Sequence, residues 1–392
     1  MQKLPLDGIR VVDFTTARAG SHITQWLGIM GAEVFKIESE LRPDGMRISH
    51  RFADLNTSKK SITLNMTKPK SVELVKKLVK ISDIVTDNFG GAVMERWGLG
   101  YSELKKIKPD IIVYTGCGWG RTGPYRERPA YAPVIDAFNG FAFSNGYVGG
   151  PPLLIGEGGW TDSVSAQHAV FSILAALFHR MMTGEGQYID LSMSEATLSF
   201  APEITMNYTI NEKIMERTGN RDNIMAPHGC YRCQGDDKWV AIAISNDDEW
   251  TAFCKVIGNP DWTKENEFNN QLSRWQNQDE LDKHVQEWTI KHTHYEAMGI
   301  LQKAGITAGA SLDIGEIVND PHLKERGYMV EMEHPEMGKV VRAAVPWRLS
   351  DTPKGNYTAP PLLGADNNYV FGELLGLSQE EIKQLHAEQV IY

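Results

Sequence analysis

The chain has 392 residues, of which 42% are hydrophobic and 23% are charged, and its formal net charge is −10. Such a composition is that of a folded globular protein, and the length exceeds what one hydrophobic core usually supports, so we expect two domains. The negative charge and the lack of a long basic run argue against nucleic acid as the main partner.

The sequence shows no feature of an exported or membrane-bound protein. Residues 1–20 lack the charged and then apolar pattern of a secretory signal. The longest apolar run, 166–177, is too short and too interrupted to span a bilayer. Four cysteines in a chain of this length argue for a reducing compartment. We therefore expect a cytoplasmic protein without membrane contact.

One group of residues has the composition of a metal site, because Cys230 and Cys233 lie near His228. A structural zinc site needs four ligands, and no second pair of cysteines follows. Both cysteines also fall in a segment with the pattern of a β-hairpin. We expect packed strands there and no bound metal.

The first third of the chain alternates short β-rich runs with helical segments. This alternation predicts a mainly parallel sheet with helices on both faces, which binds ligands at the carboxyl ends of its strands. The predicted strands are 8–14, 32–38, 83–87 and 110–116, and the predicted helices are 21–30, 70–81 and 101–107.

The first strand-to-helix turn, Thr15–Ser21, does not carry a nucleotide-binding fingerprint. It lacks G-x-G-x-x-G, and no P-loop pattern is present either, so NAD, FAD and ATP lose their main support. Gly20 and Ser21 still provide a helix start with free amides, which suits a phosphate or a carbonyl oxygen.

Asp162 follows the loop E-G-G-W at 157–160 and precedes an apolar helix. Two interpretations are open. Aspartate is a common helix cap, and taken alone this window favours capping. Alternatively, the amides of the helix start hold the carboxylate ionised in an apolar pocket, where it serves as a nucleophile.

The remaining chain predicts a second, smaller α+β domain. A strand at 187–191 and a helical stretch at 193–209 precede a polar boundary. The smaller unit then runs from about Pro227 to Pro321.

Eight segments, in order and with matching spacing, resemble the class III (family III) CoA-transferases, the group that includes formyl-CoA and carnitine CoA-transferases. The similarity runs from about residue 5 to 390. The segments are P-L-D-G-I-R-V-V-D-F-T at 5–15, A-G-S-H-I-T-Q-W-L-G-I-M-G-A-E-V-F-K-I-E at 19–38, N-T-S-K-K-S-I-T-L-N at 56–65, D-N-F-G at 87–90, R-W-G-L-G at 96–100, G-P-Y-R-E-R-P-A-Y at 123–131, W-T-D-S through T-G-E-G-Q at 160–187, and P-P-L-L-G at 360–364.

The resemblance implies a domain organisation, an assembly and a set of site residues. A large Rossmann-like domain is built from both chain ends, 1–210 and 330–392, and a small α+β domain, 225–325, is inserted between them through the linkers 211–224 and 326–329. The assembly is an intertwined homodimer, or a heteromer with a homologous subunit. Asp162 falls on the catalytic aspartate of the family and Tyr131 on an active-site tyrosine. Trp119 and Trp160 are further candidates for the walls of the substrate pocket. The positions that match the CoA site are Arg18, Ala19, Leu64, Asn88, Phe89 and Arg96.

Some positions depart from the family pattern. Arg18 stands where the family often has Gln, Ser39 where some members have an Arg, and Ala132 where the formyl-CoA enzyme has a carboxylate. The glycine-rich loop of that enzyme has no clear counterpart near 219–230. Oxalate and formate are therefore not expected as substrates.

The implied reaction moves CoA from an acyl-CoA donor to a free carboxylic acid through mixed anhydrides and an aspartyl-CoA thioester on Asp162. It requires CoA as a substrate and no permanently bound cofactor or metal. By analogy the donor is succinyl-CoA or acetyl-CoA. The aromatic residues suit an acceptor larger than oxalate, such as an arylsuccinate, a branched acid or a 2-hydroxy acid.

Two alternatives belong to other functional classes. An acyl-CoA racemase of the same superfamily needs an acid and a base on opposite faces of its substrate, and its relatives use a histidine upstream of the aspartate. No histidine lies between His50 and His168 here. A non-catalytic CoA-binding subunit is the second alternative, and the retained Asp162 argues against it.

Overall fold

The computed structural model describes residues 3–155 and 159–392, which divide into two compact units. The large unit contains Met1–Ala142, Leu154–Met215 and Gly327–Tyr392, and the small unit contains Phe143–Leu153 and Glu216–Arg326.

The sequence analysis placed Phe143–Leu153 in the large domain, which is wrong. This segment is tied to the start of the small unit, because Gly219 donates its amide to the Gly146 carbonyl (2.9 Å) and Arg217 donates to the Phe143 carbonyl (2.7 Å).

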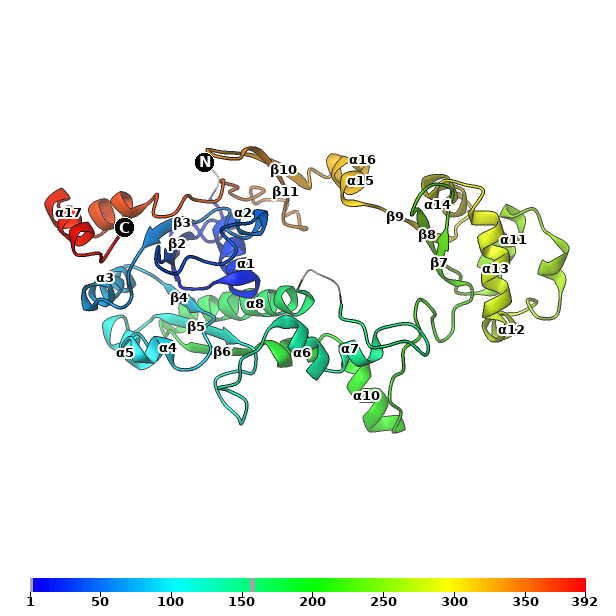
Figure 1. Ribbon diagram of the computed structural model, residues 1–392, viewed down its shortest axis with the longest axis horizontal. Coiled ribbons are helices and arrows are strands. Elements are labelled where there is room, and N and C mark those ends of the chain that lie inside the picture. The colour runs from blue at the N-terminus through cyan, green and yellow to red at the C-terminus, as the bar shows by residue number, and fades with distance from the viewer. Residues whose placement is uncertain (1–2, 156–158) are drawn as a thin grey trace. The chain divides into compact units, whose positions relative to one another are not determined.

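The large unit is built on a six-stranded, fully parallel sheet with the order β3-β2-β1-β4-β5-β6 (Figure 1). The order reverses between β1 and β4, which is where a sheet of this type opens a crevice for ligands. The predicted α/β class and parallel sheet are confirmed. The strands are β1 (Arg10–Asp13), β2 (Glu33–Glu38), β3 (Lys60–Thr63), β4 (Ile84–Asp87), β5 (Ile112–Cys117) and β6 (Tyr188–Ser192).

Helices pack on both faces of the sheet because its strands are apolar on both faces. Val11 and Val12 belong to two different buried clusters, since neighbouring residues of a strand point to opposite sides. The cluster around Val11 includes α1 (Ala17–Ile29) and α8 (Trp160–Thr183). The cluster around Val12 includes α3 (Pro69–Lys80), α5 (Tyr101–Ile107), η2 (Asn368–Leu374) and α17 (Gln379–Ala387).

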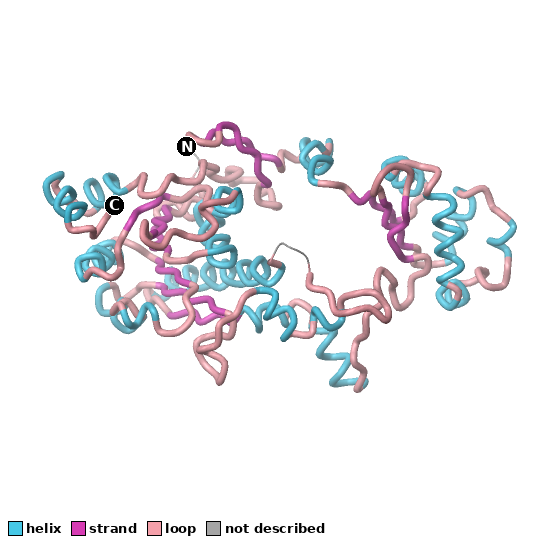
Figure 2. The backbone as a smooth tube through the Cα atoms, viewed as in Figure 1, coloured by secondary structure: helices cyan, strands magenta, loops and turns pink. Residues whose placement is uncertain are grey.

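Shorter elements complete the large unit (Figure 2). The helical stretch predicted at 193–209 is divided into two helices, because Pro202 cannot donate the amide that would continue the first one. These elements are α2 (His50–Leu55), α4 (Val93–Arg96), α6 (Ala132–Phe138), α9 (Met193–Leu198), α10 (Pro202–Asn211) and the hairpin of β10 (Met329–His334) and β11 (Gly338–Ala343).

The small unit is an antiparallel three-stranded sheet covered by helices. The short helix α7 (Phe141–Ser144) spans the boundary between the two units as they are divided. Buried Arg274 joins the loop before the sheet to the first helix, by donating to the Ala226 carbonyl and to Asp247 (2.7 Å). The elements are β7 (His228–Arg232), β8 (Trp239–Ala243), β9 (Thr307–Ser311), α11 (Asp247–Val256), η1 (Asp261–Lys264), α12 (Gln271–Gln276), α13 (Gln278–Thr289), α14 (His294–Lys303), α15 (Ile314–Asn319) and α16 (Pro321–Glu325).

The hairpin of β7 and β8 contains Cys230, whereas Cys233 lies just after β7 and is fully buried. Within residues 3–155 and 159–392, no group of three His, Cys, Asp or Glu side chains has the arrangement of a metal site. No helix in the same ranges is long and apolar enough to cross a membrane.

Candidate functional site

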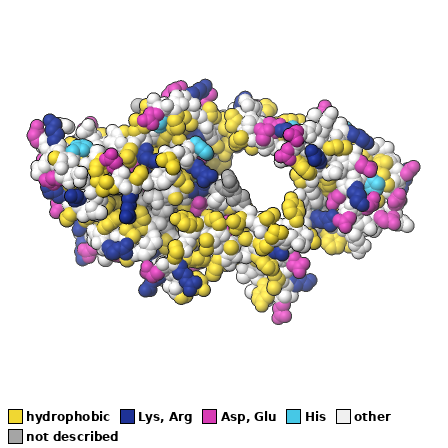
Figure 3. Space-filling model, in the orientation of Figure 1, with side chains coloured by type: hydrophobic (Ala, Val, Ile, Leu, Met, Phe, Trp, Pro, Cys, Tyr) yellow, Lys and Arg dark blue, Asp and Glu magenta, His cyan; other side chains and the backbone are white. Residues whose placement is uncertain are grey.

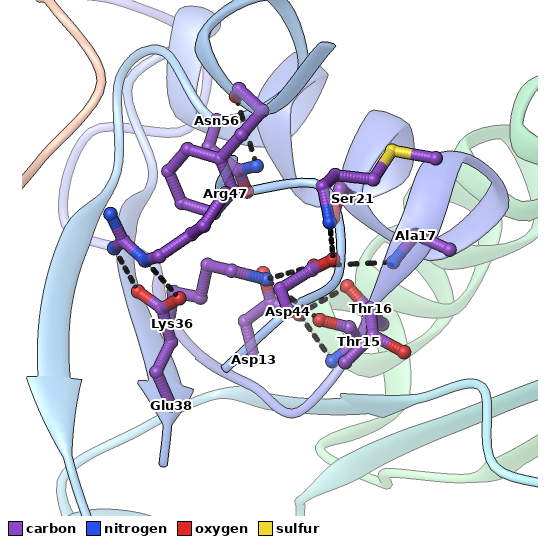
Figure 4. A network of polar contacts seen from close by, with 12 residues as sticks. Asp13, Thr15, Thr16, Ala17, Ser21, Lys36, Glu38, Asp44, Arg47 and Asn56 are labelled. Carbon is purple, nitrogen blue, oxygen red and sulfur yellow. Dashed lines mark hydrogen bonds and ion pairs between the residues drawn. The ribbon is translucent and has the colours of Figure 1, made fainter. Parts of the chain in front are cut away.

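The turn between β1 and α1 has an unusual backbone conformation at the carboxyl end of the sheet. Ala17 opens α1 with φ of 57°, a region that costs a non-glycine residue about 1 kcal/mol. Asp44 accepts a hydrogen bond from the Ala17 amide (3.2 Å), and Lys36 donates to the Thr15 carbonyl (2.8 Å). Lys36 and Asp44 lie 3.6 Å apart and are almost completely buried, so they hold the turn in place (Figure 4).

A second buried pair supports the same turn from within the sheet. Asp13, the last residue of β1, accepts hydrogen bonds from Thr15 and Thr24 and lies 3.3 Å from the Lys59 ammonium. Burial works to raise the pKa of Asp13, but Lys59 and Lys36 hold that pKa below its ordinary value. Burial lowers the pKa of Lys59 to about 8, against the attraction of Asp13.

The loop after β4 is bound directly to the β1–α1 turn. Asn88 accepts from the Thr16 amide (2.9 Å) and donates to the Thr16 carbonyl (2.8 Å). Gly20 makes this approach feasible, because a Cβ there would lie 2.3 Å from Thr15 Cβ and 2.9 Å from Asn88 Cγ. The two loops therefore meet at the switch point of the sheet, where a ligand is expected.

Asp162 lies in the first turn of α8, and the N-cap of that helix is Gly159 in the left-handed region. The interpretation of Asp162 as a simple cap is therefore not supported. Burial raises the pKa of Asp162 to about 6, the Arg18 cation opposes this rise, and the Asp136 carboxylate adds to it. Asp162 is partly buried, and it is mostly ionised at pH 7 because its pKa stays below that value.

A buried network lies beneath the start of α8. Asp136 on α6 accepts a hydrogen bond from the Thr161 hydroxyl, which in turn accepts from Thr197 on α9 (3.2 Å). All three residues are almost fully buried. This network fixes the backbone that carries Asp162 and leaves the Asp162 carboxylate outside it.

Arg18, one of the predicted CoA-site residues, is near Asp162. A Cβ built on Gly159 would lie 2.5 Å from Asp162 Oδ2 and 3.0 Å from Arg18 Cδ, so both side chains border the same glycine. The remaining loop residues 156–158, including Glu157, lie outside the described residues.

The other predicted CoA-site residues differ in their exposure. Ala19 and Asn88 are at the carboxyl-end turns, and Phe89 follows Asn88 and packs edge-on against Trp97 (5.7 Å between ring centres). Arg96 on α4 is exposed. Leu64 is only 1% exposed and belongs to the core, so its side chain offers almost no surface to a ligand.

The predicted pocket walls come from three elements. Trp119 contacts Phe138 (4.8 Å) and Trp160 contacts Phe200 (5.5 Å), both edge-on. Each indole Nε1 is buried and has no hydrogen-bond partner among the described residues, 3–155 and 159–392. Tyr131 is the N-cap residue of α6 and is 80% exposed.

The sequence analysis missed the residues that line a groove of about 480 Å³ beside the β1–α1 turn. One of them, Asp44, pairs with Lys36 in β2. Lys36 is the informative residue, since a lysine inside a strand that is otherwise buried needs a partner. This lysine is visible in the segment A-E-V-F-K-I-E, but the sequence did not indicate which carboxylate would form the ion pair with it. The groove is lined by Thr16, Ala17, Arg42, Pro43, Asp44, Gly45, Met46, Ser49 and Arg51.

Comparison with known proteins decides the family. The sequence model of CoA-transferase family III matches residues 6–367. The chain belongs to CoA-transferase family III. The resemblance seen in the sequence is thereby confirmed, and the protein is a CoA-transferase with a Rossmann-like large unit.

Among its relatives, the CoA-transferase is 33% identical to succinyl-CoA–D-citramalate CoA-transferase of Chloroflexus aurantiacus, over 99% of this chain and 98% of that protein. It is 34% identical to the alpha subunit of succinyl-CoA–L-malate CoA-transferase of the same organism, over 100% of this chain and 93% of that protein. It is 31% identical to formyl-CoA:oxalate CoA-transferase of Rhodopseudomonas palustris, over 97% of this chain and 96% of that protein.

The fold also matches that of a solved relative. A crystal structure of a CAIB/BAIF family protein from Brucella suis superposes with a TM-score of 0.88 at 28% identity, covering 95% of this chain and 100% of that one.

Proposed function

We propose that the enzyme transfers CoA from an acyl-CoA donor to a free carboxylic acid through a covalent intermediate on Asp162. The observation that carries the proposal is the state of this carboxylate. It is partly buried at the start of α8, lies beside a cation, and has a pKa of about 6. A carboxylate that is ionised and yet poorly solvated is a competent nucleophile.

The reaction needs four attacks and no net proton transfer. An Asp162 oxygen attacks the thioester carbon of the donor, the C–S bond breaks, and a mixed anhydride and a CoA thiolate form. The thiolate attacks the Asp162 carbonyl carbon, and the donor acid leaves as a carboxylate. The acceptor carboxylate then attacks the aspartyl-CoA thioester, and the released thiolate attacks the acceptor carbonyl of the second anhydride, which restores Asp162.

Each tetrahedral intermediate carries a negative oxygen, which backbone amides stabilise. The start of α1 at Ala19 and the start of α8 are the elements that offer such amides. Because anhydrides hydrolyse, the site must exclude water. The indole rings of Trp119 and Trp160 and the ring of Tyr131 are suited to this when they wall the substrate pocket.

The CoA moiety is proposed to occupy the switch point of the sheet. Arg18, Ala19, Asn88 and Phe89 lie on the two turns that meet there, and the groove beside Ala17 extends the site. Arg96 and the backbone of Leu64 complete the set by resemblance. We propose no bound metal or permanent cofactor, since the chemistry uses only carboxylates and a thiolate.

For the substrates, we propose succinyl-CoA as the donor and a branched or 2-hydroxy acid larger than oxalate as the acceptor. The names of two relatives include succinyl-CoA, and their acceptors, D-citramalate and L-malate, are 2-hydroxy acids. An arylsuccinate is a branched acid with an aromatic substituent and no 2-hydroxyl group, and it is the alternative acceptor. Ala132, in place of a carboxylate, argues against oxalate and formate.

The surface of the large unit supports a partner chain. On α8, Phe171, Phe178 and Met181 are 76%, 62% and 71% exposed, and Val134 and Phe138 on α6 are 50% and 57% exposed. Figure 3 shows hydrophobic side chains gathered over α6 and α8. Exposed apolar area of this kind marks an interface. We propose an interlocked homodimer, or a heteromer with a homologous subunit, since the related L-malate enzyme has alpha and beta subunits.

The test is transfer of CoA by the purified chain alone. Incubation with succinyl-CoA and labelled succinate should produce labelled succinyl-CoA, and Asp162→Asn should abolish the exchange. Retained turnover in Asp162→Asn would remove the nucleophile from the proposal. Exchange of the α-proton of a 2-methylacyl-CoA without CoA transfer would favour the racemase. No exchange by pure chain, with activity restored by a homologous subunit, would favour a non-catalytic partner.

A further inference from the structure

The unusual feature of this site is the Arg18 cation. Its charge opposes the rise in the pKa of Asp162, but within residues 3–155 and 159–392 no hydrogen bond or ion pair engages its guanidinium. The side chain is only partly exposed and shares the Gly159 surface with Asp162. A guanidinium that is withdrawn from water and unpaired is costly, so it is held ready for an anion.

The neighbouring basic groups cannot take this role. Lys36 and Lys59 are buried and paired with Asp44 and Asp13. His22 lies one turn after Arg18 on α1, but burial lowers its pKa to about 4, so it is neutral at pH 7. Of these four basic groups, Arg18 is therefore the one that borders the Gly159 surface with Asp162 and can meet a ligand.

The chemistry of the ligand follows from where Arg18 lies. The acyl group of the donor must reach Asp162 with its thioester carbon, and a neutral acyl chain offers nothing to a guanidinium. A dicarboxylic acyl group such as succinyl carries a second carboxylate three carbon–carbon bonds from the thioester carbon. A guanidinium matches a carboxylate with two parallel N–H donors.

We propose that Arg18 binds the distal carboxylate of a dicarboxylic acyl group while its proximal carbon reacts at Asp162. The inference rests on the proposed function and goes further, since it assigns Arg18 to the acyl group rather than to CoA. Donor and acceptor become attached to the same aspartate in turn, so one guanidinium selects a dicarboxylate in both halves of the reaction.

The experiment compares succinyl-CoA with butyryl-CoA, which has the same chain length and a methyl group in place of the distal carboxylate. The measured quantity is the ratio of the two kcat/KM values. A charge-assisted hydrogen bond is worth about 1.5–3 kcal/mol, so Arg18→Gln should lower the ratio by about 10- to 150-fold. Arg18→Lys, which keeps the charge, should recover part of it. Arg326→Gln removes an exposed arginine of the small unit and should leave the ratio unchanged.

Three outcomes would overturn the assignment. A parallel loss for both donors would mean that Arg18 acts on CoA or on the thioester oxygen. An unchanged ratio with a shifted pH profile would mean that it only adjusts the pKa of Asp162. A wild-type ratio near one would mean that the site does not select dicarboxylates.

Failure of the proposed function is distinguishable, because the wild type would then transfer CoA from neither donor. Calorimetric binding to Asp162→Asn decides the role of Arg18 independently of turnover. The inference expects succinyl-CoA to bind at least about 10-fold more tightly than butyryl-CoA and this preference to vanish in Arg18→Gln. Equal affinities would refute it.

Discussion

The buried carboxylate of Asp44 is expected to set both the stability and the geometry of the β1–α1 turn. Asp44→Ala removes the partner of Lys36 and the acceptor of the Ala17 amide. Breaking a buried ion pair costs about 3–5 kcal/mol. Lys36 keeps its bond to the Thr15 carbonyl (2.8 Å), so we expect the lower end, about 3 kcal/mol.

The strain at Ala17 adds a second, separable contribution. Its φ of 57° destabilises the folded state by about 1 kcal/mol, whereas glycine adopts this φ without that strain. Ala17→Gly in the Asp44→Ala background should therefore recover up to about 1 kcal/mol if the turn keeps its conformation. The control is Glu40→Ala, an exposed carboxylate on the same loop, which should change stability by less than about 0.5 kcal/mol.

The assay is urea unfolding of each variant, with hydrogen–deuterium exchange to locate the change. Asp44→Ala should shift the midpoint, speed exchange in peptides that contain residues 14–20, and raise the KM for acyl-CoA. An unfolding free energy equal to that of Glu40→Ala, with unchanged exchange at 14–20, would refute the argument that this pair holds the turn.

Two further predictions concern the nucleophile itself. Burial raises the pKa of Asp162 to about 6, and only the carboxylate attacks. Therefore kcat/KM for acyl-CoA should be constant above pH 6 and should fall by about tenfold for each pH unit below 6. A profile in which kcat/KM begins to fall only below pH 4 would contradict this. Gly159→Ala should lower kcat by at least about 100-fold with the fold retained, since the new methyl would lie 2.5 Å from Asp162 Oδ2 and would displace it. The control is Gly149→Ala, whose new methyl would meet no atom within 4 Å. A wild-type kcat in Gly159→Ala would show that the position of the carboxylate is not critical.

Strand and helix patterns predicted β1, β2, β4, β5 and β6 of the large unit but missed β3, whose residues K-S-I-T include one aliphatic side chain. The pattern is clearest in β1, where Val11 and Val12 are buried on opposite faces and so require helices on both sides. The sequence could not reveal which carboxylate pairs with Lys36, because Asp44 lies in an irregular loop whose path depends on the folded backbone.

The same limit applies to the candidate site. The position of Asp162 before an apolar helix predicted a carboxylate at a helix start, but not that Gly159 would be the cap or that Arg18 would border the same glycine. Both depend on how α1 packs against α8, which is a long-range contact. Resemblance supplied the role of Leu64, and local sequence gave no indication that its side chain would be buried.

Chemical trapping of the acylated enzyme tests the central claim most directly. The enzyme is mixed with succinyl-CoA and quenched with hydroxylamine, which converts an aspartyl thioester to a hydroxamate, and the peptides are then analysed by mass spectrometry. The account predicts a hydroxamate on Asp162 in the wild type and none in Asp162→Asn. A hydroxamate on another residue, or an unmodified Asp162 under conditions of full turnover, would contradict it.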